Sequence, residues 1–282
     1  MTDRCLMAVH AHPDDEVFST GGILAKSAQE GDRVVVVYCT NGEAGEMHDA
    51  DLIPAEAIPR LGEIRMEEAR KACALLGVTD VVFLGYRDSG MKDTEENANP
   101  AAFANASLDE ATQRLIEVIR ATQPQVMIAY DEDGGYGHPD HIMAHRVALE
   151  AFQRLQGEPN GPRKLYFSAR SREGFRRYVE AIKEHGLTVP WIDGDFNFDE
   201  YGVPDAEITA HIDVEPFVSL KKRALSVHKT QIRPDFFYLQ IPDEALMAGS
   251  GLEYFVRIFP PPEPGERETD LFAPVATREA FA

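Results

Sequence analysis

Four short, continuously apolar runs are the feature that most constrains how this chain can fold. They are Cys5–Val9, Val34–Cys39, Val81–Leu84 and Val126–Tyr130. Runs of this length are typical of strands that are buried on both faces of a parallel sheet. Helical patterns separate them, at Gly21–Gln29, Glu63–Leu76 and Ser107–Thr122. Strand and helix alternating at this spacing predict an α/β fold, a Rossmann-like parallel sheet with helices on both faces.

The second half of the sequence has weaker patterns. We predict a strand at Lys164–Ser168, helices at Glu173–His185 and Pro216–His228, and an edge strand at Glu207–Ile212. Residues 186–206 and 257–271 are rich in proline, glycine and acids, which favours loop or tail. We therefore expect a single domain over residues 1–282. Residues 1–156 would form the catalytic core, and residues 157–282 would form a C-terminal elaboration around the active site.

Charge and cysteine usage restrict the partners and the compartment. The 28 basic and 48 acidic residues give a formal charge of −20, which argues against nucleic acid and anionic membranes as partners. Three cysteines lack any C-x-x-C spacing, and no apolar run is long enough to cross a membrane. The start of the sequence lacks the pattern of a secretory signal. We expect a cytoplasmic protein that acts on a small molecule. The sequence does not decide whether the protein forms a homo-oligomer.

Polar and acidic residues gather where the predicted strands end. The segments that follow the four strands are HAHPDDE, TNGEAGE, GYRDSG and YDEDGGYGHPDH, whereas the returns from helix to strand are plain. Ligands and substrates of open α/β sheets bind outside the carboxyl ends of the strands. This edge of the sheet is therefore predicted to carry the function.

Two of these segments share an unusual composition, His12-Pro13-Asp14-Asp15 and His138-Pro139-Asp140-His141. Each places histidine and carboxylate together where a strand gives way to a helix, and proline is tolerated at the first helical position. Imidazole and carboxylate are ligands that zinc and related divalent ions accept. Two histidines and one carboxylate are typical of hydrolytic metal sites, where a further acid can act as general base. The pair of segments thus predicts a metal-dependent hydrolase.

The same segments carry a resemblance to a known family. HAHPDDE together with GGYGHPDH resembles the PIG-L/LmbE-like metal-dependent deacetylases, which remove acyl groups from N-acyl-glucosamine-type amines. The resemblance covers roughly residues 5–150. In the C-terminal part, His228-Lys-Thr-Gln231-Ile and the later ETDLF resemble the branch that holds mycothiol S-conjugate amidase and the mycothiol-biosynthesis deacetylase.

The resemblance implies a metal site and a general base. His12, Asp15 and His141 would be the metal ligands, and the ion would be zinc, with iron an alternative in the cell. Asp14, next to a ligand, would deprotonate the attacking water.

It also implies three assisting residues. His138 would stabilise the tetrahedral oxyanion or protonate the leaving amine, and Tyr136 would donate a hydrogen bond to the oxyanion. Asp140 would orient a histidine by contacting its ring on the side away from the metal.

On the substrate side, the family positions fall on Glu46, Arg65 and Asp88, and Gln231 and His228 would line the pocket from the C-terminal half. Carboxylates accept hydrogen bonds from sugar hydroxyls, and arginine offers a rigid fork of donors. Arg65 has a plainer alternative, an ion pair with Glu68 or a neighbouring acid on its own helix.

Other residues near the two segments are given structural roles. We interpret His10 as a buried, hydrogen-bonded histidine, His145 as supporting or structural, and Glu16 as a brace of the helix N-terminus.

The sequence thus favours a zinc-dependent amide hydrolase acting on an N-acyl-glucosamine-type substrate, with a thiol conjugate of the mycothiol kind as first choice. Deacetylation of another N-acetyl sugar is the first alternative, such as a bacillithiol-type precursor or an antibiotic intermediate. A non-catalytic metal-binding or sugar-binding module is the second. A nucleotide-binding protein is disfavoured, because no G-x-G-x-x-G follows the first strand.

Overall fold

The first half of the chain forms four parallel strands of the sheet, as the apolar runs predict. The computed structural model describes residues 4–190, 192 and 196–274. The strands of the first half are β1 (Cys5–His10), β2 (Arg33–Thr40), β3 (Asp80–Tyr86) and β4 (Val126–Ala129). β1 lies between β2 and β4 and is parallel to both, with Leu6 opposite Val34 and Val126.

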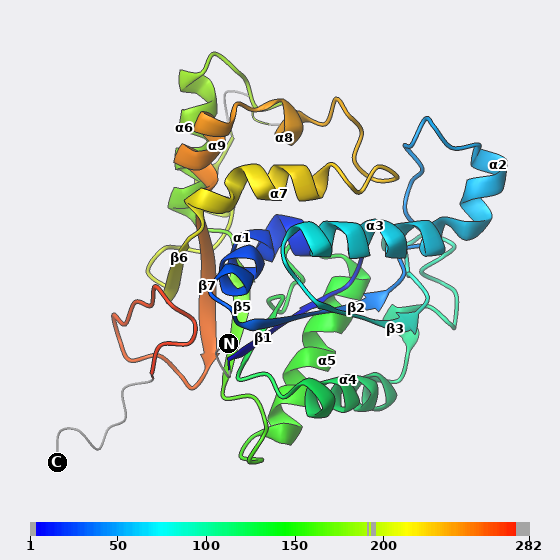
Figure 1. Ribbon diagram of the computed structural model, residues 1–282, viewed down its shortest axis with the longest axis vertical. Coiled ribbons are helices and arrows are strands. Elements are labelled where there is room, and N and C mark those ends of the chain that lie inside the picture. Colours follow the sequence, from blue (N-terminus) through cyan, green and yellow to red (C-terminus); the bar gives the residue numbers. More distant parts are fainter. Residues whose placement is uncertain (1–3, 191, 193–195, 275–282) are drawn as a thin grey trace.

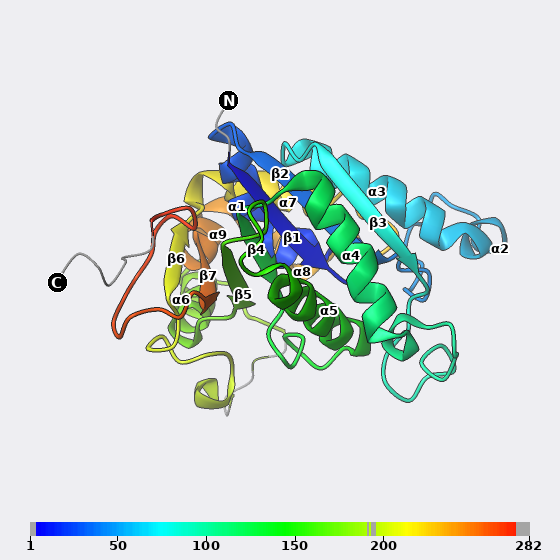
Figure 2. The same ribbon diagram turned by 90° about the horizontal axis from the view of Figure 1, so that it is seen from below.

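Helices cover both faces of this sheet (Figure 1). One face carries α1 (Asp15–Gln29), α3 (Leu61–Leu75) and α7 (Val218–Leu225), and the other carries α4 (Leu108–Thr122) and α5 (Pro139–Leu155). Figure 2, seen from below, shows α4 and α5 crossing the second face. Successive side chains of a strand point to opposite faces, so Leu6 and Ala8 pack in one core cluster and Met7 and Val9 in the other.

The second half extends the same sheet with three more strands. They are β5 (Lys164–Ala169), β6 (Ala210–Asp213) and β7 (Leu252–Phe259), and the strand order is β3-β2-β1-β4-β5-β7-β6. β5 is parallel to β4, whereas β7 is antiparallel to both β5 and β6. The sheet is therefore mixed, and its parallel part spans the five strands from β3 to β5.

The predictions for the second half are confirmed in part. The strand at 164–168 is present as β5, the predicted edge strand is β6 at the sheet edge, and the two predicted helices are α6 (Arg172–Glu184) and α7. The prediction of loop or tail over 257–271 is wrong at its start, because residues 257–259 belong to β7. Charged Glu253 and Arg257 interrupt the apolar pattern of β7, yet both are buried against charged partners.

Short elements complete the described part of the chain. They are α2 (Pro54–Ala57), η1 (Ile58–Arg60), η2 (Phe103–Asn105), η3 (Phe198–Glu200), η4 (Glu215–Phe217), α8 (Phe237–Gln240) and α9 (Asp243–Ser250). α4 begins at Ser107, whose side chain caps the helix by accepting a hydrogen bond from the Glu110 amide. Across the described residues, none of the helices is long and apolar enough to span a membrane.

Candidate metal and catalytic site

The two His-Pro-Asp segments meet at the carboxyl ends of β1 and β4. These strands are neighbours and run in the same direction, so the loops that leave them emerge side by side. The ring centroids of His12 and His138 lie 4.6 Å apart, those of His12 and His141 5.2 Å apart, and those of His138 and His141 5.1 Å apart. The cluster is buried, because each of these three histidines is almost excluded from solvent.

Asp14 occupies a strained position at the start of α1. Its φ of 109° lies in the left-handed region, and no side chain caps the helix there within the described residues. The Asp14 amide donates to Glu16 Oε2 (2.9 Å), and Arg65 Nη2 lies 3.2 Å from Asp14 Oδ2. Burial raises the pKa of the Asp14 carboxyl to about 6, against the opposing charge of Arg65. A carboxylate with such a pKa is suited to act as a general base near neutral pH.

His138 begins the other helix and acts as its cap. Its Nδ1 accepts the Asp140 amide (3.1 Å), and Pro139 follows at the first helical position. Burial, together with the nearby rings of His12 and His141, lowers the pKa of His138 to about 4. The ring is therefore neutral at pH 7. Since Nδ1 is an acceptor, we assign the proton to Nε2, which makes that atom a hydrogen-bond donor toward the site.

Hydrogen bonds behind His12 and His141 leave one nitrogen of each ring available to a metal. His141 Nδ1 lies 3.0 Å from Gly134 O, and its Nε2 is buried without a hydrogen-bond partner among the described residues. His12 Nε2 lies 3.1 Å from Asp140 Oδ2, which leaves Nδ1 as the acceptor atom. His12 Nδ1 and His141 Nε2 both lie 3.4 Å from Asp15 Oδ2. Although burial opposes it, the contacts with Asp140, Asp15 and Asp88 raise the pKa of His12 well above its usual value, so a bound cation would take the place of a proton there. Two imidazole nitrogens beside a carboxylate fit a divalent cation.

Asp15 is held in place by two further donors. Its Oδ2 accepts the Tyr130 hydroxyl (2.8 Å) and the His12 amide (2.8 Å). Although burial opposes ionisation, the rings of His141 and His12 hold the pKa of Asp15 well below its usual value. The sequence pattern predicts no role for Tyr130 at the site, because the residue is simply the last apolar position of the predicted strand.

Two other groups of side chains could also hold a metal ion. The ligand atoms of His12, His138 and His141 lie within 4.8 Å of one another, as do those of His12, Asp88 and Asp140. The hydrogen bonds disfavour both. The Asp140 amide leaves His138 Nε2 protonated, and Asp140 itself accepts from Ser89 N and Oγ as well as pairing with His12. Asp140 thus lies where sequence reasoning placed it, behind a histidine.

Tyr136 faces His141 across the opening of the site. The two ring centroids are 4.9 Å apart, and the Tyr136 ring is 6.1 Å from that of His138. Burial raises the pKa of the Tyr136 hydroxyl to about 12, so the hydroxyl keeps its proton and can donate a hydrogen bond.

Two predicted substrate residues lie beneath the catalytic cluster. Arg65 is buried, with Nη1 donating to Gly42 O (2.5 Å) and Nη2 to Pro13 O (2.7 Å). The plainer alternative, an ion pair with an acid of its own helix, is not what the described residues show, because Arg65 pairs with Asp14. Asp88 is also buried; its Oδ1 accepts the Gly90 amide (2.8 Å) and lies 3.6 Å from His12 Nε2.

The other three differ in burial, since Glu46 is exposed, Gln231 is half-buried and His228 is fully buried. Glu46 is exposed and lies 3.0 Å from His48, and Gln231 Nε2 donates to the Glu46 carbonyl (2.7 Å). The prediction that His228 lines the pocket is wrong for this structure. His228 is fully buried behind α1, where its Nε2 lies 2.8 Å from Glu16 Oε1. Glu16 thus braces the start of α1 from a buried position.

His10 and His145 have the structural roles given to them above. His10 is buried, and its Nε2 lies 3.0 Å from Thr20 Oγ1. The ring of His145 contacts Tyr130 O (2.9 Å) and packs on Phe167.

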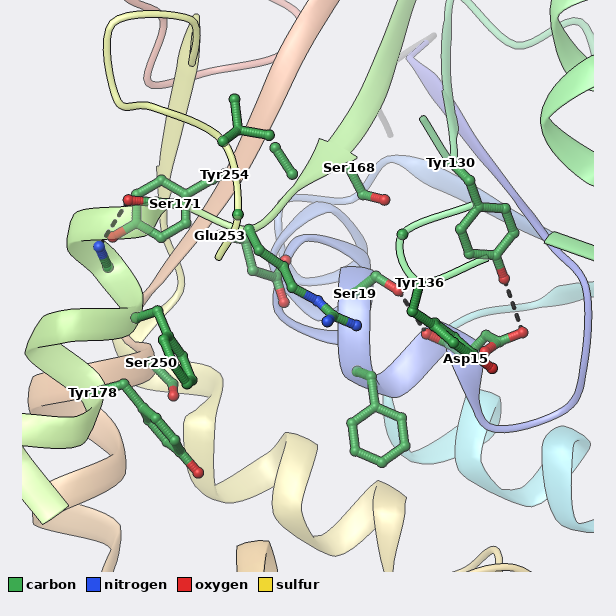
Figure 3. Close-up of a pocket in the computed structure, with 18 of the residues that line it drawn as sticks. Asp15, Ser19, Tyr130, Tyr136, Ser168, Ser171, Tyr178, Ser250, Glu253 and Tyr254 are labelled. Carbon is green, nitrogen blue, oxygen red and sulfur yellow. Dashed lines mark hydrogen bonds between the residues drawn. The ribbon is translucent and has the colours of Figure 1, made fainter. Parts of the chain in front are cut away.

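A pocket of about 840 Å³ opens beside the histidine cluster (Figure 3). Asp14, Asp15, Tyr136 and His141 are among the residues that line it. Other lining residues come from α1, from the segment after β4 and from the C-terminal half, and Figure 3 shows Ser171, Tyr178 and Tyr254 at the opposite end from Asp15 and Tyr136. The pocket residues that sequence reasoning missed include Phe18, Ser168, Arg170, Ser171, Phe175, Tyr178, Tyr201, Tyr238, Lys221, Glu253 and Tyr254. In the described part of the chain, the five predicted substrate residues lie outside this lining.

Comparison with known proteins identifies the family. The model described as PIG-L: GlcNAc-PI de-N-acetylase matches residues 7–152, which is more than half of the chain. The chain belongs to the PIG-L family. This PIG-L protein is 42% identical to 1D-myo-inositol 2-acetamido-2-deoxy-alpha-D-glucopyranoside deacetylase of Acidothermus cellulolyticus, over 98% of this chain and 97% of the relative. It is a hydrolytic N-deacetylase, an enzyme that cleaves an amide C–N bond.

Solved structures share the fold of this PIG-L protein at lower identity. N,N'-diacetylchitobiose deacetylase from Pyrococcus horikoshii has a TM-score of 0.58 at 24% identity, with 90% of this chain and 84% of that chain covered. GalB, the 4-carboxy-2-hydroxymuconate hydratase from Pseudomonas putida KT2440, has a TM-score of 0.59 at 18% identity, with 91% and 97% covered. Because the second is named for a different reaction, the fold alone does not decide the chemistry.

Proposed function

We propose that this PIG-L protein removes the acetyl group from an N-acetylglucosaminyl-inositol, releasing acetate and the free amine. The observation that carries the substrate is the 42% identity to the Acidothermus cellulolyticus deacetylase, which extends over both halves of the chain and so includes the pocket. The observation that supports the chemistry is the buried Nε2 of His141, which lies beside the Asp15 carboxylate and has no hydrogen-bond partner in the described part of the chain.

His12 Nδ1, Asp15 and His141 Nε2 would hold the metal ion, which we propose to be zinc, with iron as the alternative. When bound, the ion would supply Lewis-acid activation of water and of the amide carbonyl. The donor set of two imidazoles and one carboxylate is the support for this assignment. Burial lowers the pKa of His141 and keeps its ring neutral, whereas contacts with Asp140, Asp15 and Asp88 outweigh burial and raise the pKa of His12, so binding of the ion would release a proton from His12.

The protein's own residues carry the proton transfers in this proposal. Asp14 takes a proton from the attacking water as the oxygen forms its bond to the amide carbon. His138 Nε2–H and the Tyr136 hydroxyl donate hydrogen bonds to the oxyanion that develops on the carbonyl oxygen. When the C–N bond breaks, the leaving nitrogen takes up the proton that Asp14 received from the water. Asp140 fixes the orientation of His12 through the 3.1 Å contact to Nε2.

On the sugar side, we propose that Glu46 and Gln231 contact substrate hydroxyls from the loop beside Asp14. That loop is joined to the site through Arg65, which contacts Gly42 and Asp14. Arg65 and Asp88, being buried, would act chiefly by holding Asp14 and His12. The small-molecule substrate and the buried free thiols of the three cysteines support a cytoplasmic location for this protein.

A second candidate is the amidase that cleaves a larger acyl group from a thiol conjugate of the mycothiol kind. The observation that favours it is the pocket of about 840 Å³ beside Asp15, with aromatic walls from Phe175, Tyr178 and Tyr254. Such a pocket has room for more than an acetyl group.

The test is a paired substrate assay on protein whose metal content has been measured. Amine release is scored for N-acetylglucosaminyl-inositol, for free N-acetylglucosamine and for a bulky thiol conjugate. We expect the highest kcat/KM for the inositol glycoside. A higher value for the conjugate would replace the proposal with the second candidate, and a higher value for the free sugar would indicate a general sugar deacetylase. If no substrate is cleaved while metal and sugar still bind, the protein is a binding module instead.

A further inference from the structure

Glu253 binds the middle of the helix whose first turn carries Asp14 and Asp15. This buried residue of β7 accepts the Gly22 amide at Oε1 (2.8 Å) and the Ile23 amide at Oε2 (2.8 Å). Both amides lie inside α1, and 230 residues of sequence separate Glu253 from Ile23. Figure 3 shows Glu253 beside the helix that carries Ser19 and Asp15.

Lys221 holds the other side of this carboxylate. Its Nζ lies 2.5 Å from Glu253 Oε1, and the Lys221 side chain is buried on α7. Gly21 and Gly22 allow the close approach, because a Cβ on Gly22 would lie 2.5 Å from Val214 Cβ and one on Gly21 would lie 3.3 Å from Lys221 Cγ. Three segments of the C-terminal half therefore meet α1 at this glycine pair.

Two hydroxyl groups join this contact to the first turn of α1. Ser19 Oγ donates to Asp15 O (3.1 Å), and Thr20 Oγ1 donates to Glu16 O (3.0 Å). The helix rises 1.5 Å per residue, so Gly22 lies about 10 Å along the axis from Asp15. A small rotation or shift of α1 at the glycine pair would consequently move the Asp14 and Asp15 side chains relative to His138 and His141 on α5.

The burial of the Lys221–Glu253 pair also needs an explanation other than stability. A buried ion pair is often no more stable than well-packed apolar residues of the same volume. The two backbone amides supply that explanation, because only an ionised carboxylate accepts from both at once and it requires a counter-charge. Both residues line the same pocket as Asp14 and Asp15.

We propose that Glu253, with Lys221, is a positioning residue that sets where the Asp14–Asp15 turn lies in the catalytic cluster. The inference rests on the proposed function, in which Asp15 is a metal ligand and Asp14 the general base. It predicts that a substitution of Glu253 lowers both metal affinity and kcat and leaves substrate binding unchanged.

The test compares E253Q with E268Q. Glu268 forms an equally buried ion pair with Lys164, with 2.6 Å between the two charged groups. Lys164 is the first residue of β5, whereas the pocket residues Ser168 to Ser171 lie at the other end of that strand. In E253Q the side-chain NH₂ would face one of the two backbone N–H groups of α1. Because both groups are hydrogen-bond donors, one of the two hydrogen bonds would be lost. Three quantities are measured for each variant, namely Tm, the kcat and KM for amine release, and the affinity of metal-free protein for Co²⁺ followed by its visible absorption.

We expect both variants to lower Tm, while E253Q alone lowers kcat about tenfold or more and weakens Co²⁺ binding about tenfold. The KM of E253Q should stay within about twofold of wild type. The inference is overturned if E253Q and E268Q match in kcat and Co²⁺ affinity. It is equally overturned if E253Q raises KM with Co²⁺ affinity unchanged, because Glu253 would then contact substrate.

If E253Q does not fold, E253D carries the same test. Its carboxylate keeps the charge but is one methylene shorter and cannot reach both amides, so the same losses are expected. Wild-type kcat and Co²⁺ affinity in E253D would contradict the inference. Failure of the proposed function can be told apart from failure of this inference. If the proposed function is wrong, the wild-type protein does not cleave N-acetylglucosaminyl-inositol. The Co²⁺ affinities of the variants still report the position of the Asp14–Asp15 turn in that case.

Discussion

The two His-Pro-Asp segments are nearly the same in sequence, yet they begin their helices in different ways. In the second, His138 is the cap, Pro139 is the first helical residue, and the imidazole accepts the Asp140 amide. In the first, the cap position falls to Asp14 with a φ of 109°, two residues after His12, and no described side chain accepts a hydrogen bond as a cap. A two-position difference in where the helix begins therefore gives equivalent residues different surroundings.

This difference separates their chemistry. Capping uses the Nδ1 of His138 and leaves it a hydrogen-bond donor at Nε2, whereas His12 is free of capping and keeps Nδ1 as an acceptor beside Asp15. The first segment is thus suited to hold a cation and accept a proton, and the second donates hydrogen bonds through His138 while adding His141 to the cation site. Four predictions test that division.

The largest effect is expected for Asp14→Asn. Asparagine tolerates the left-handed conformation and is close to isosteric, so the fold and the metal content should be retained. Loss of the general base should lower kcat about 10³-fold. Steady-state kinetics on metal-loaded protein measure this. A kcat within tenfold of wild type would assign the base elsewhere.

His138→Asn should be next. The asparagine oxygen can replace the cap by accepting the Asp140 amide, but the shorter side chain cannot donate toward the oxyanion. We expect kcat to fall about 10²-fold while the metal content is unchanged. His141→Asn is the matched comparison, because it should lose metal. If His138→Asn also loses its metal, the cation is held by His12, His138 and His141 instead.

Tyr130→Phe should have a smaller effect, confined to the first segment. The change removes the 2.8 Å hydrogen bond to Asp15 Oδ2 with little change in volume. Metal affinity should weaken about tenfold, as for other residues that orient a ligand. Titration of metal-free protein with Zn²⁺ against a competing chelator measures it. Unchanged affinity would mean that the His12 amide suffices to orient Asp15.

Pro139→Ala should have the smallest effect. Proline at the first helical position restricts the unfolded chain, so its loss should lower the free energy of unfolding by about 0.5 kcal/mol. Urea denaturation measures the change, and kcat should stay at the wild-type value. A loss of activity would show that the proline itself, and not the cap, orients His138.

Most of the parallel sheet and the catalytic cluster could be predicted from the sequence. Strands buried on both faces leave continuous apolar runs, and the loops after adjacent parallel strands must emerge together, so the two segments were expected to meet. Residues whose partners lie far away in the sequence were not predictable. His228 pairs with Glu16 across 212 residues, and neither its neighbours nor its spacing reveals that contact.

The failure at β7 has the same origin. Glu253 and Arg257 would be costly in a strand unless paired, and their partners Lys221, Glu266 and Glu268 lie on other segments. The pocket wall was missed as well, since scattered tyrosines and serines after β5 resemble ordinary surface residues until the fold brings them together.

The place of β7 inside the sheet has a consequence for synthesis on the ribosome. β7 is the last strand in the described chain, yet it pairs with β5 on one side and β6 on the other. The outer edge of β5 therefore has no native partner until roughly 80 further residues have been translated, which takes on the order of 4 to 16 s. An open edge of this kind can pair with other chains during that interval. Since Glu253 arrives with β7, its contact with α1 forms only after that strand has been translated.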